Sequence, residues 1–191
     1  MTVIEIVAEV TGRLERLGVL YAVGGSVASS AWGQMRQTND ADIAIQLANS
    51  DVDALTSTFG EPFFISRDEL NEALSSTAEF RSVQLLHMDE AFKIDLFLLH
   101  AGEYESTELE RARSIDIVPG AAVRFSAPEN VILAKLRWFV LGNQVSDRQW
   151  NDIVTVLEVQ AGKLDEPYLA RWALHFGVAE LLERARCQAF S

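Results

Sequence analysis

The sequence contains few of the residues that cross-link or interrupt a chain. Its single cysteine, Cys187, cannot form an internal disulfide, which excludes a disulfide scaffold and leads us to expect a reducing compartment, the cytoplasm. The four prolines form no proline-rich linker. The first ten residues contain Glu5 and Glu9 but no basic residue, so we expect no signal peptide.

A long apolar run is also missing. The longest run, residues 131–141, is interrupted by Lys135 and Arg137 and falls short of the ~18 residues that a membrane helix needs. We therefore expect no membrane association. A chain of 191 residues, 49% of them hydrophobic, is long enough to bury a core without a structural metal.

Positive charge is scarce. The 16 Lys and Arg residues stand against 28 Asp and Glu residues, which gives a net charge of −12. Binding along extended nucleic acid depends on neutralising many phosphates, so that class of partner is disfavoured, whereas local nucleotide binding is not. Of the basic residues 13 are Arg and 3 are Lys, and Arg suits bidentate contacts to phosphate.

Several catalytic motifs are absent. His87, His100 and His175 do not have the spacing of a zinc site. The sequence contains no GxGxxG, no Walker A loop and no GxSxG. These absences argue against zinc enzymes, dinucleotide-binding domains, P-loop ATPases and serine hydrolases.

The spacing of apolar residues predicts the secondary structure of the first part of the chain. Residues 2–17 carry apolar side chains three and four apart, which indicates a helix that starts at a capping box of Thr2 and Glu5. Apolar runs and alternating patterns favour strands at residues 19–23, 40–46, 79–87, 91–99, 115–118 and 121–125.

From Ser126 onward the pattern is helical throughout. Ser126 and Glu129 have the spacing of a capping box, and the apolar side chains after them recur at helical intervals. The sequence therefore predicts an α/β (α+β) fold: a mixed sheet with flanking helices in residues 1–125, followed by a C-terminal helical bundle in residues 126–191.

A glycine-rich turn and three acidic residues are the best candidates for chemistry. Gly24-Gly25-Ser26 follows a predicted strand, so its backbone N–H groups and its hydroxyl can hold an anion. Asp40 and Asp42 lie two apart on one strand and share a face. Asp95 lies in an almost wholly apolar strand, where an unpaired carboxylate is costly. Three converging carboxylates need a cation, and Mg²⁺ with a phosphate substrate suits them.

This pattern resembles the nucleotidyltransferase superfamily of the DNA polymerase β type. Gly24-Gly25-Ser26, Arg36-Gln37-Thr38 and Asp40-Ala41-Asp42 follow one another as in that family, and Asp95 is the third acid on a later strand. The resemblance implies that Asp40, Asp42 and Asp95 hold two Mg²⁺ ions and that Asp95 helps to activate a hydroxyl. It implies that Gly24, Gly25 and Ser26 hold the phosphates of an NTP, whose nucleoside monophosphate passes to the hydroxyl as pyrophosphate leaves.

A second string, Ser126 to Leu136 followed by Asp147-Arg148 and Asp152, resembles a bacterial branch of small nucleotidyltransferase-like proteins. That branch contains the abortive-infection type IV toxins. By this resemblance Lys135 is a contact for the triphosphate, and Arg36 and Arg148 are weaker candidates. The acceptor stays open: a small molecule such as an aminoglycoside-type drug, a protein side chain or the end of an RNA.

The acidic residues also have structural interpretations. Asp95 could pair with Lys93 or with an arginine instead of binding a metal ion. Arg36 could simply pair with Asp40 or Asp42. Each interpretation explains one residue, whereas the nucleotidyltransferase pattern explains the set.

The second string likewise leaves alternatives. Lys135 could be a surface residue or an ion-pair partner. Arg148 and Asp152, four residues apart, fit a surface pair on a helix. Asn130 stands where the resembling branch has an acid. A second function therefore stays open: a catalytically silent nucleotide-binding or regulatory protein, such as one half of a toxin–antitoxin-like pair with a protein partner.

Overall fold

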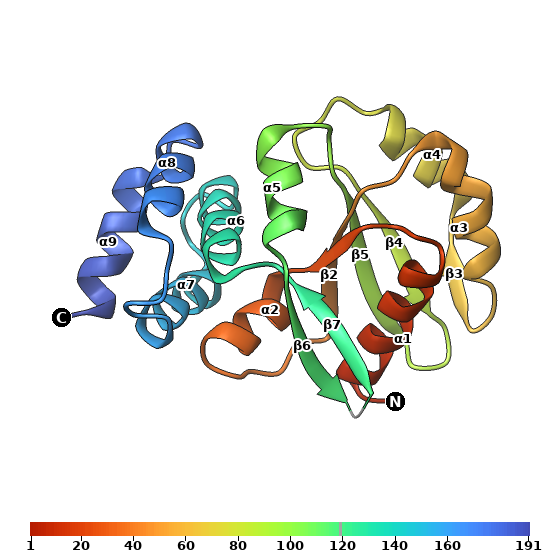
Figure 1. Cartoon of the computed structure of the whole chain (residues 1–191), viewed down its shortest axis with the longest axis horizontal. Coiled ribbons are helices and arrows are strands. Elements are labelled where there is room, and N and C mark those ends of the chain that lie inside the picture. Colours follow the sequence, from red (N-terminus) through yellow and green to blue (C-terminus); the bar gives the residue numbers. More distant parts are fainter. Residues whose placement is uncertain (119) are drawn as a thin grey trace. The chain divides into compact units, whose positions relative to one another are not determined.

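The computed structural model describes residues 1–118 and 120–191 of the chain. These residues form two compact units, and each unit is built from two separate segments of the sequence. The first unit comprises Met1–Gly24 and Thr38–Phe125, and the second comprises Gly25–Gln37 and Ser126–Ser191. Figure 1 follows the chain through the elements of both units.

The first unit combines a sheet with helices. Its strands are β1 (Tyr21–Val23), β2 (Asp40–Ile45), β3 (Phe63–Ile65), β4 (Ser82–His87), β5 (Phe92–Leu98), β6 (Arg113–Val118) and β7 (Ala121–Phe125). Its helices are α1 (Val3–Arg16), the 3₁₀ helix η1 (Asn49–Asp51), α3 (Val52–Thr58), α4 (Arg67–Ser75) and α5 (Glu103–Arg111).

The sheet has the strand order β3-β4-β5-β2-β1-β7-β6. Strand β2 pairs antiparallel with β1 and parallel with β5, while β5 pairs antiparallel with β4. Strand β1 pairs parallel with β7. The mixed sheet that the sequence predicts is therefore confirmed, and β2 and β5, which are distant in sequence, are direct neighbours.

One face of the sheet carries the core of this unit. Helix α1 starts at the predicted Thr2–Glu5 capping box and buries the stripe of Ile6, Val7, Val10 and Leu14. Burial of such side chains stabilises the fold by roughly 1.5–3 kcal/mol each. At residues 40–43 of β2 and 92–96 of β5, buried apolar residues alternate with half-buried charged ones, so the charged side chains lie on the opposite face.

The second unit is helical. Its helices are α2 (Gly25–Trp32), α6 (Pro128–Leu141), α7 (Asp147–Val159), α8 (Glu166–His175) and α9 (Ala179–Ala189). The predicted C-terminal helical region is therefore present. The predicted capping box of Ser126 and Glu129 is wrong: Ala127 is the N-cap of α6, and the buried Glu129 accepts a hydrogen bond from the backbone N–H of Asp165 at 2.8 Å.

Residues 25–37 group differently from the sequence-based division, which placed them within residues 1–125. Helix α2 consists mainly of small residues and packs against α6 and α7. The indole N–H of Trp32 donates to the backbone oxygen of Ser126 at 2.7 Å, and Gln160 donates to the backbone oxygen of Trp32 at 2.8 Å. A single boundary along the sequence cannot represent a helix that packs with a distant part of the chain.

Within the described part of the chain, no helix is both long enough and apolar enough to cross a membrane.

Candidate active site

The three acidic residues singled out in the sequence lie on the two central, parallel strands of the first unit. In the register of β2 and β5, Asp42 is opposite Asp95, and Asp40 is opposite Lys93. Residues opposite one another in neighbouring strands point to the same face of a sheet. The structure therefore brings Asp40, Asp42 and Asp95 to one face, where all three are half-buried.

Lys93 lies among these carboxylates. Its Nζ donates a hydrogen bond to Oδ2 of Asp95 at 2.6 Å, as in the alternative interpretation of Asp95. The hydrogen bond to Asp95 raises the pKa of the Lys93 ammonium, burial opposes that rise, and the charges of Asp95, Asp40 and Asp42 add to it. Lys93 is thus a counter-ion for the acidic residues of β2 and β5.

The other two acids are positioned by the chain around them. Oδ1 of Asp40 accepts a hydrogen bond from the hydroxyl of Thr38 at 2.7 Å, which fixes the carboxylate at the start of β2. The backbone oxygen of Asp42 accepts a hydrogen bond from the N–H of Gly24 at 2.8 Å. The start of the glycine-rich turn is thereby held beside β2.

The next residue of that turn requires glycine. Gly25 has a φ of 55°, in the left-handed region that other residues enter only at a cost. The chain reverses direction there and enters α2 immediately. The requirement for glycine at this position therefore has a backbone cause that is independent of any ligand.

The donor set fits Mg²⁺ by its chemistry, because carboxylate oxygens on one rigid face are the ligands that this ion takes, together with oxygens of a substrate. Among residues 1–118 and 120–191, however, no three acidic, His or Cys side chains converge closely enough to hold a metal ion as they stand. Asp95 is instead directed to the ammonium of Lys93.

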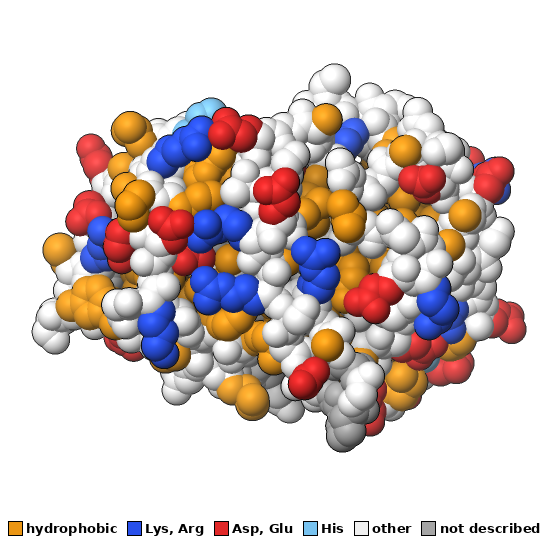
Figure 2. All heavy atoms as spheres, in the orientation of Figure 1, with side chains coloured by type: hydrophobic (Ala, Val, Ile, Leu, Met, Phe, Trp, Pro, Cys, Tyr) orange, Lys and Arg blue, Asp and Glu red, His pale blue; other side chains and the backbone are white. Residues whose placement is uncertain are grey.

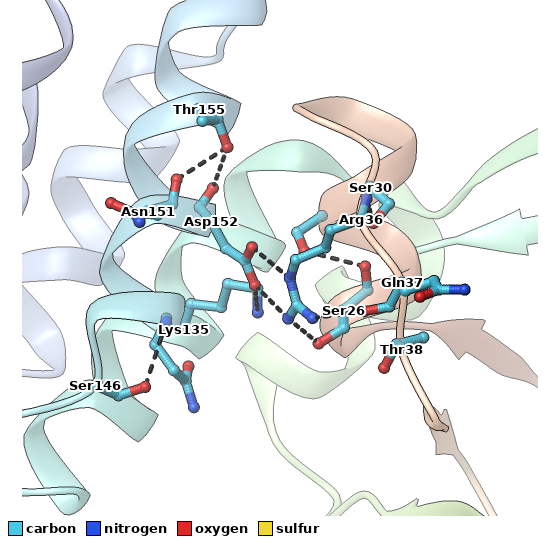
Figure 3. Close-up of polar contacts among 12 residues, drawn as sticks. Ser26, Ser30, Arg36, Gln37, Thr38, Lys135, Ser146, Asn151, Asp152 and Thr155 are labelled. Atoms are coloured by element: carbon cyan, nitrogen blue, oxygen red, sulfur yellow. Dashed lines mark hydrogen bonds and ion pairs between the residues drawn. The ribbon is translucent and has the colours of Figure 1, made fainter.

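A second cluster, formed by Ser26, Arg36, Lys135 and Asp152, lies within the helical unit (Figure 3). Asp152 in α7 is 5% exposed and accepts hydrogen bonds from Nε and Nη2 of Arg36 at 2.9 and 2.8 Å. Its Oδ2 also accepts one from Nζ of Lys135 at 2.7 Å. Nη2 of Arg36 donates further to the hydroxyl of Ser26. One buried carboxylate therefore holds both basic residues.

The carboxyl of Asp152 is ionised by its two basic partners. Burial alone would raise the pKa of Asp152, but the hydrogen bond from Arg36 and the charge of Lys135 outweigh burial and lower this pKa below its usual value. Arginine and lysine side chains in such a cluster are also groups that can bind an anionic ligand.

The structure corrects one interpretation of these residues. Asp152 is buried and bonds to Arg36 and Lys135, so its interpretation as the partner of Arg148 in a surface pair is wrong. Asp152 is also a partner of Arg36 that the sequence did not indicate. The sequence signal that could have identified Asp152 is its position four residues before Val156, a buried residue on the same side of α7.

A cavity of about 320 Å³ opens beside this cluster in the helical unit. Most of its lining residues have polar side chains: Gln34, Met35, Arg36, Arg148, Asn151, Asp152 and Thr155. Its volume is at the lower end for small-molecule sites. Arg36 and Arg148 make it a place where a negatively charged group can be bound.

Asn130 is fully buried in α6, and neither polar atom of its side chain has a hydrogen-bond partner in the described part of the chain. Asn130 stands where the resembling branch has an acid, and in this structure the position is buried inside the helical unit. Nothing in the structure gives its amide a role.

Comparisons with known proteins agree on the fold. No protein-family model matches the sequence, and no curated protein is significantly similar to it. Solved structures do match. The solution structure of the antibiotic-resistance factor ANT(2'')-Ia has a TM-score of 0.60 and 11% identity, over 95% of this chain and 96% of that one.

Two further structures support the same fold. A crystal structure of ANT(2'')-Ia in complex with adenylyl-2''-tobramycin has a TM-score of 0.60 and 12% identity, over 93% of this chain and 98% of that one. An antigenic nucleotidyltransferase-like protein from Paracoccidioides brasiliensis has a TM-score of 0.56 and 18% identity, over 95% and 90% of the two chains. The chain therefore has the nucleotidyltransferase fold that its sequence resemblance predicts.

Proposed function

We propose that this protein is a Mg²⁺-dependent nucleotidyltransferase that moves a nucleoside monophosphate from an NTP to a hydroxyl group. The observation that carries the proposal is the placement of Asp40, Asp42 and Asp95 on one face of two adjacent strands in a nucleotidyltransferase fold. Half-buried carboxylates at neighbouring positions repel one another, so their presence favours a site that works with cations.

The acids have separate roles in this proposal. Asp40, Asp42 and Asp95 hold two Mg²⁺ ions, and Asp95 also helps to activate the acceptor hydroxyl. When bound, the ions supply positive charge at the α-phosphate and orient the attacking and leaving oxygens. The acceptor hydroxyl would pass its proton to the carboxylate of Asp95, its oxygen would bond to the α-phosphorus, the bond to the bridging oxygen would break, and pyrophosphate would leave with the displaced electron pair.

The phosphates of the NTP are assigned to the glycine-rich turn and to the basic residues. The backbone N–H of Gly25 and the hydroxyl of Ser26 hold phosphate oxygens, while Gly24, whose N–H is donated to Asp42, keeps the turn beside β2. Arg36 and Lys135, which both donate to Asp152, add positive charge for the phosphates. This assignment is supported by the hydrogen bond between Arg36 and Ser26, which ties a cation to the turn.

For the acceptor we propose a small hydroxylated molecule. The crystal structure of ANT(2'')-Ia contains a tobramycin that carries an adenylyl group, which is a precedent on this fold. A net charge of −12 disfavours long nucleic acid. On the face that Figure 2 displays, basic side chains are separated by acidic, apolar and other side chains. This distribution fits a small ligand bound at one site better than a long polyanion bound along the surface.

The test is transfer of label from an α-labelled NTP. Purified protein is incubated with Mg²⁺ and each NTP, alone and with a small-molecule fraction, proteins or RNA from a lysate. The expected result is label on one class of acceptor, lost in the Asp40→Asn/Asp42→Asn double variant. The matched control is Asp68→Asn/Asp89→Asn, which removes two exposed acids of the same unit and keeps full transfer. Transfer that survives the first double variant would overturn the proposal.

A second candidate is a nucleotide-binding regulator without catalysis, working with a protein partner as in a toxin–antitoxin pair. The contact of Lys93 with Asp95 favours it, because a lysine can serve as a permanent counter-ion where catalysis needs a metal. This candidate predicts that NTP binds, that no lysate fraction is labelled, and that Asp95→Asn leaves binding unchanged.

For either function we propose the cytoplasm as the compartment, since the one cysteine, Cys187, is free and exposed.

A further inference from the structure

Lys93 is placed as a counter-ion within the acidic strands. It lies two residues before Asp95 on β5, on the same face, and opposite Asp40 across the pairing with β2. Its ammonium is 2.6 Å from Oδ2 of Asp95. The sequence has only three lysines, and this one lies on the face that Asp40, Asp42 and Asp95 share.

The two partners of this ion pair differ in mobility. Asp95 extends from the strand on a short side chain and is 17% exposed, whereas the side chain of Lys93 is 38% exposed. Lysine carries its charge at the end of four flexible carbons and is strongly hydrated, so its ammonium can move from Asp95 into the solvent without any movement of the backbone. The carboxylates of Asp40, Asp42 and Asp95 stay on their face of the sheet, because β2 and β5 each pair with a strand on both sides.

A divalent cation and the ammonium of Lys93 differ in charge. A divalent cation beside Asp95 attracts its carboxylate more strongly than one ammonium does at the same distance. For Asp95, however, the two cations are alternatives, since Oδ2 is already engaged by the ammonium.

We infer that Lys93 is a built-in competitor of the divalent cation: its ammonium holds Asp95 until a metal ion displaces it, and so it weakens metal binding when no nucleotide is present. The identity of the metal site rests on the proposed function, but the competition does not require turnover. A lysine that served only to stabilise the strands would have no such effect on metal affinity.

The test measures binding of Mn²⁺, a probe for the Mg²⁺ site, by the loss of the free-ion EPR signal at one fixed pH and without nucleotide. Lys93→Met keeps the length and apolar stem and removes the charge. We expect it to bind Mn²⁺ about five- to tenfold more tightly than the wild type, as the loss of a competing, partly exposed ion pair implies. Lys93→Arg, which keeps the charge, should bind like the wild type.

Two controls separate this effect from general changes in charge and folding. Lys163→Met removes an exposed lysine of the other unit and should change affinity less than about twofold. Asp42→Asn should lose the binding. Thermal unfolding of each variant confirms that the folded protein is being measured. Equal or weaker Mn²⁺ binding by folded Lys93→Met would contradict the inference.

The outcomes distinguish this inference from the proposed function. If Lys93→Met binds Mn²⁺ more tightly while no lysate fraction accepts label, the competition stands and the transferase proposal fails. If label is transferred but Lys93→Met binds Mn²⁺ no more tightly, the transferase proposal stands and the competition fails. If neither the wild type nor Lys93→Met binds Mn²⁺, the competition is rejected together with the metal site.

Discussion

At the scale of single residues, Asp152 decides how two basic side chains are held. It is nearly fully buried and accepts hydrogen bonds from both Arg36 and Lys135. A buried ion pair adds modest net stability, but removal of one partner leaves the other charge buried without compensation. The stability of the helical unit and the placement of its cations therefore depend on one carboxylate.

Asp152→Ala is expected to lower the free energy of unfolding by about 3 kcal/mol, because Lys135 stays buried without its anion. Urea unfolding followed by circular dichroism measures this loss. The matched control is Glu158→Ala, an exposed acid of the same helix, with an expected change within about 0.5 kcal/mol. Equal effects of the two substitutions would show that the cluster contributes no stability.

The contribution of Asp152 also depends on pH in a defined direction. Its pKa in the folded chain is below its ordinary value of 3.8, so the folded state favours the ionised form. The resulting stability is complete above the pKa of the unfolded state and is lost as the pH falls through the folded value. We expect the difference in unfolding free energy between the wild type and Asp152→Asn to be constant from pH ~5 to ~8 and to shrink below pH ~4. A difference that grew on acidification would have the wrong sign.

At the scale of secondary-structure elements, local patterns predicted the strands but not their pairing. The alternation around Asp40–Asp42 and the apolar run around Asp95 predicted β2 and β5 to within two residues of their observed ends. Their parallel register, which sets Asp42 opposite Asp95, joins segments separated by about fifty residues of chain. Pairing at that distance depends on the packing of the whole sheet, and no local signal encodes it.

The same limit applies to the second cluster. The family resemblance predicts Lys135 and Arg36 as phosphate contacts, and this stays a prediction, whereas their shared partner Asp152 was not predictable. Helix α2 was predictable as a helix of small residues, while its packing against α6 and α7 was not. Hydrophobic spacing identifies which side of a helix is buried and leaves open which element buries it.

Two glycines in different elements provide a matched test of the backbone. Gly25 has a φ of 55° at the start of α2, so Gly25→Ala should lower the free energy of unfolding by about 1–2 kcal/mol. Gly12 lies inside α1, where a new Cβ meets only Nη1 of Arg16 at 3.7 Å. Gly12→Ala should therefore raise stability by about 0.5–1 kcal/mol. Urea unfolding decides both signs, and a stabilising Gly25→Ala would refute the backbone argument.

At the scale of the whole molecule, the chain passes between its two units three times, after Gly24, Gln37 and Phe125. The glycine-rich turn contains the first crossing, and Arg36-Gln37-Thr38 contains the second. The two motifs that resemble nucleotide-binding segments thus coincide with covalent connections between the units.

The most direct test of the central claim is the identity of the phosphate product. In the proposed reaction the bond between the α-phosphorus and the bridging oxygen breaks, so each transferred nucleotidyl group must release one pyrophosphate. With γ-labelled NTP, Mg²⁺ and the acceptor fraction identified by α-label transfer, we predict labelled pyrophosphate in a one-to-one ratio with the labelled acceptor. The Asp40→Asn/Asp42→Asn variant should produce neither. Release of labelled orthophosphate without transfer would contradict the account, because it would mean attack at the γ-phosphorus.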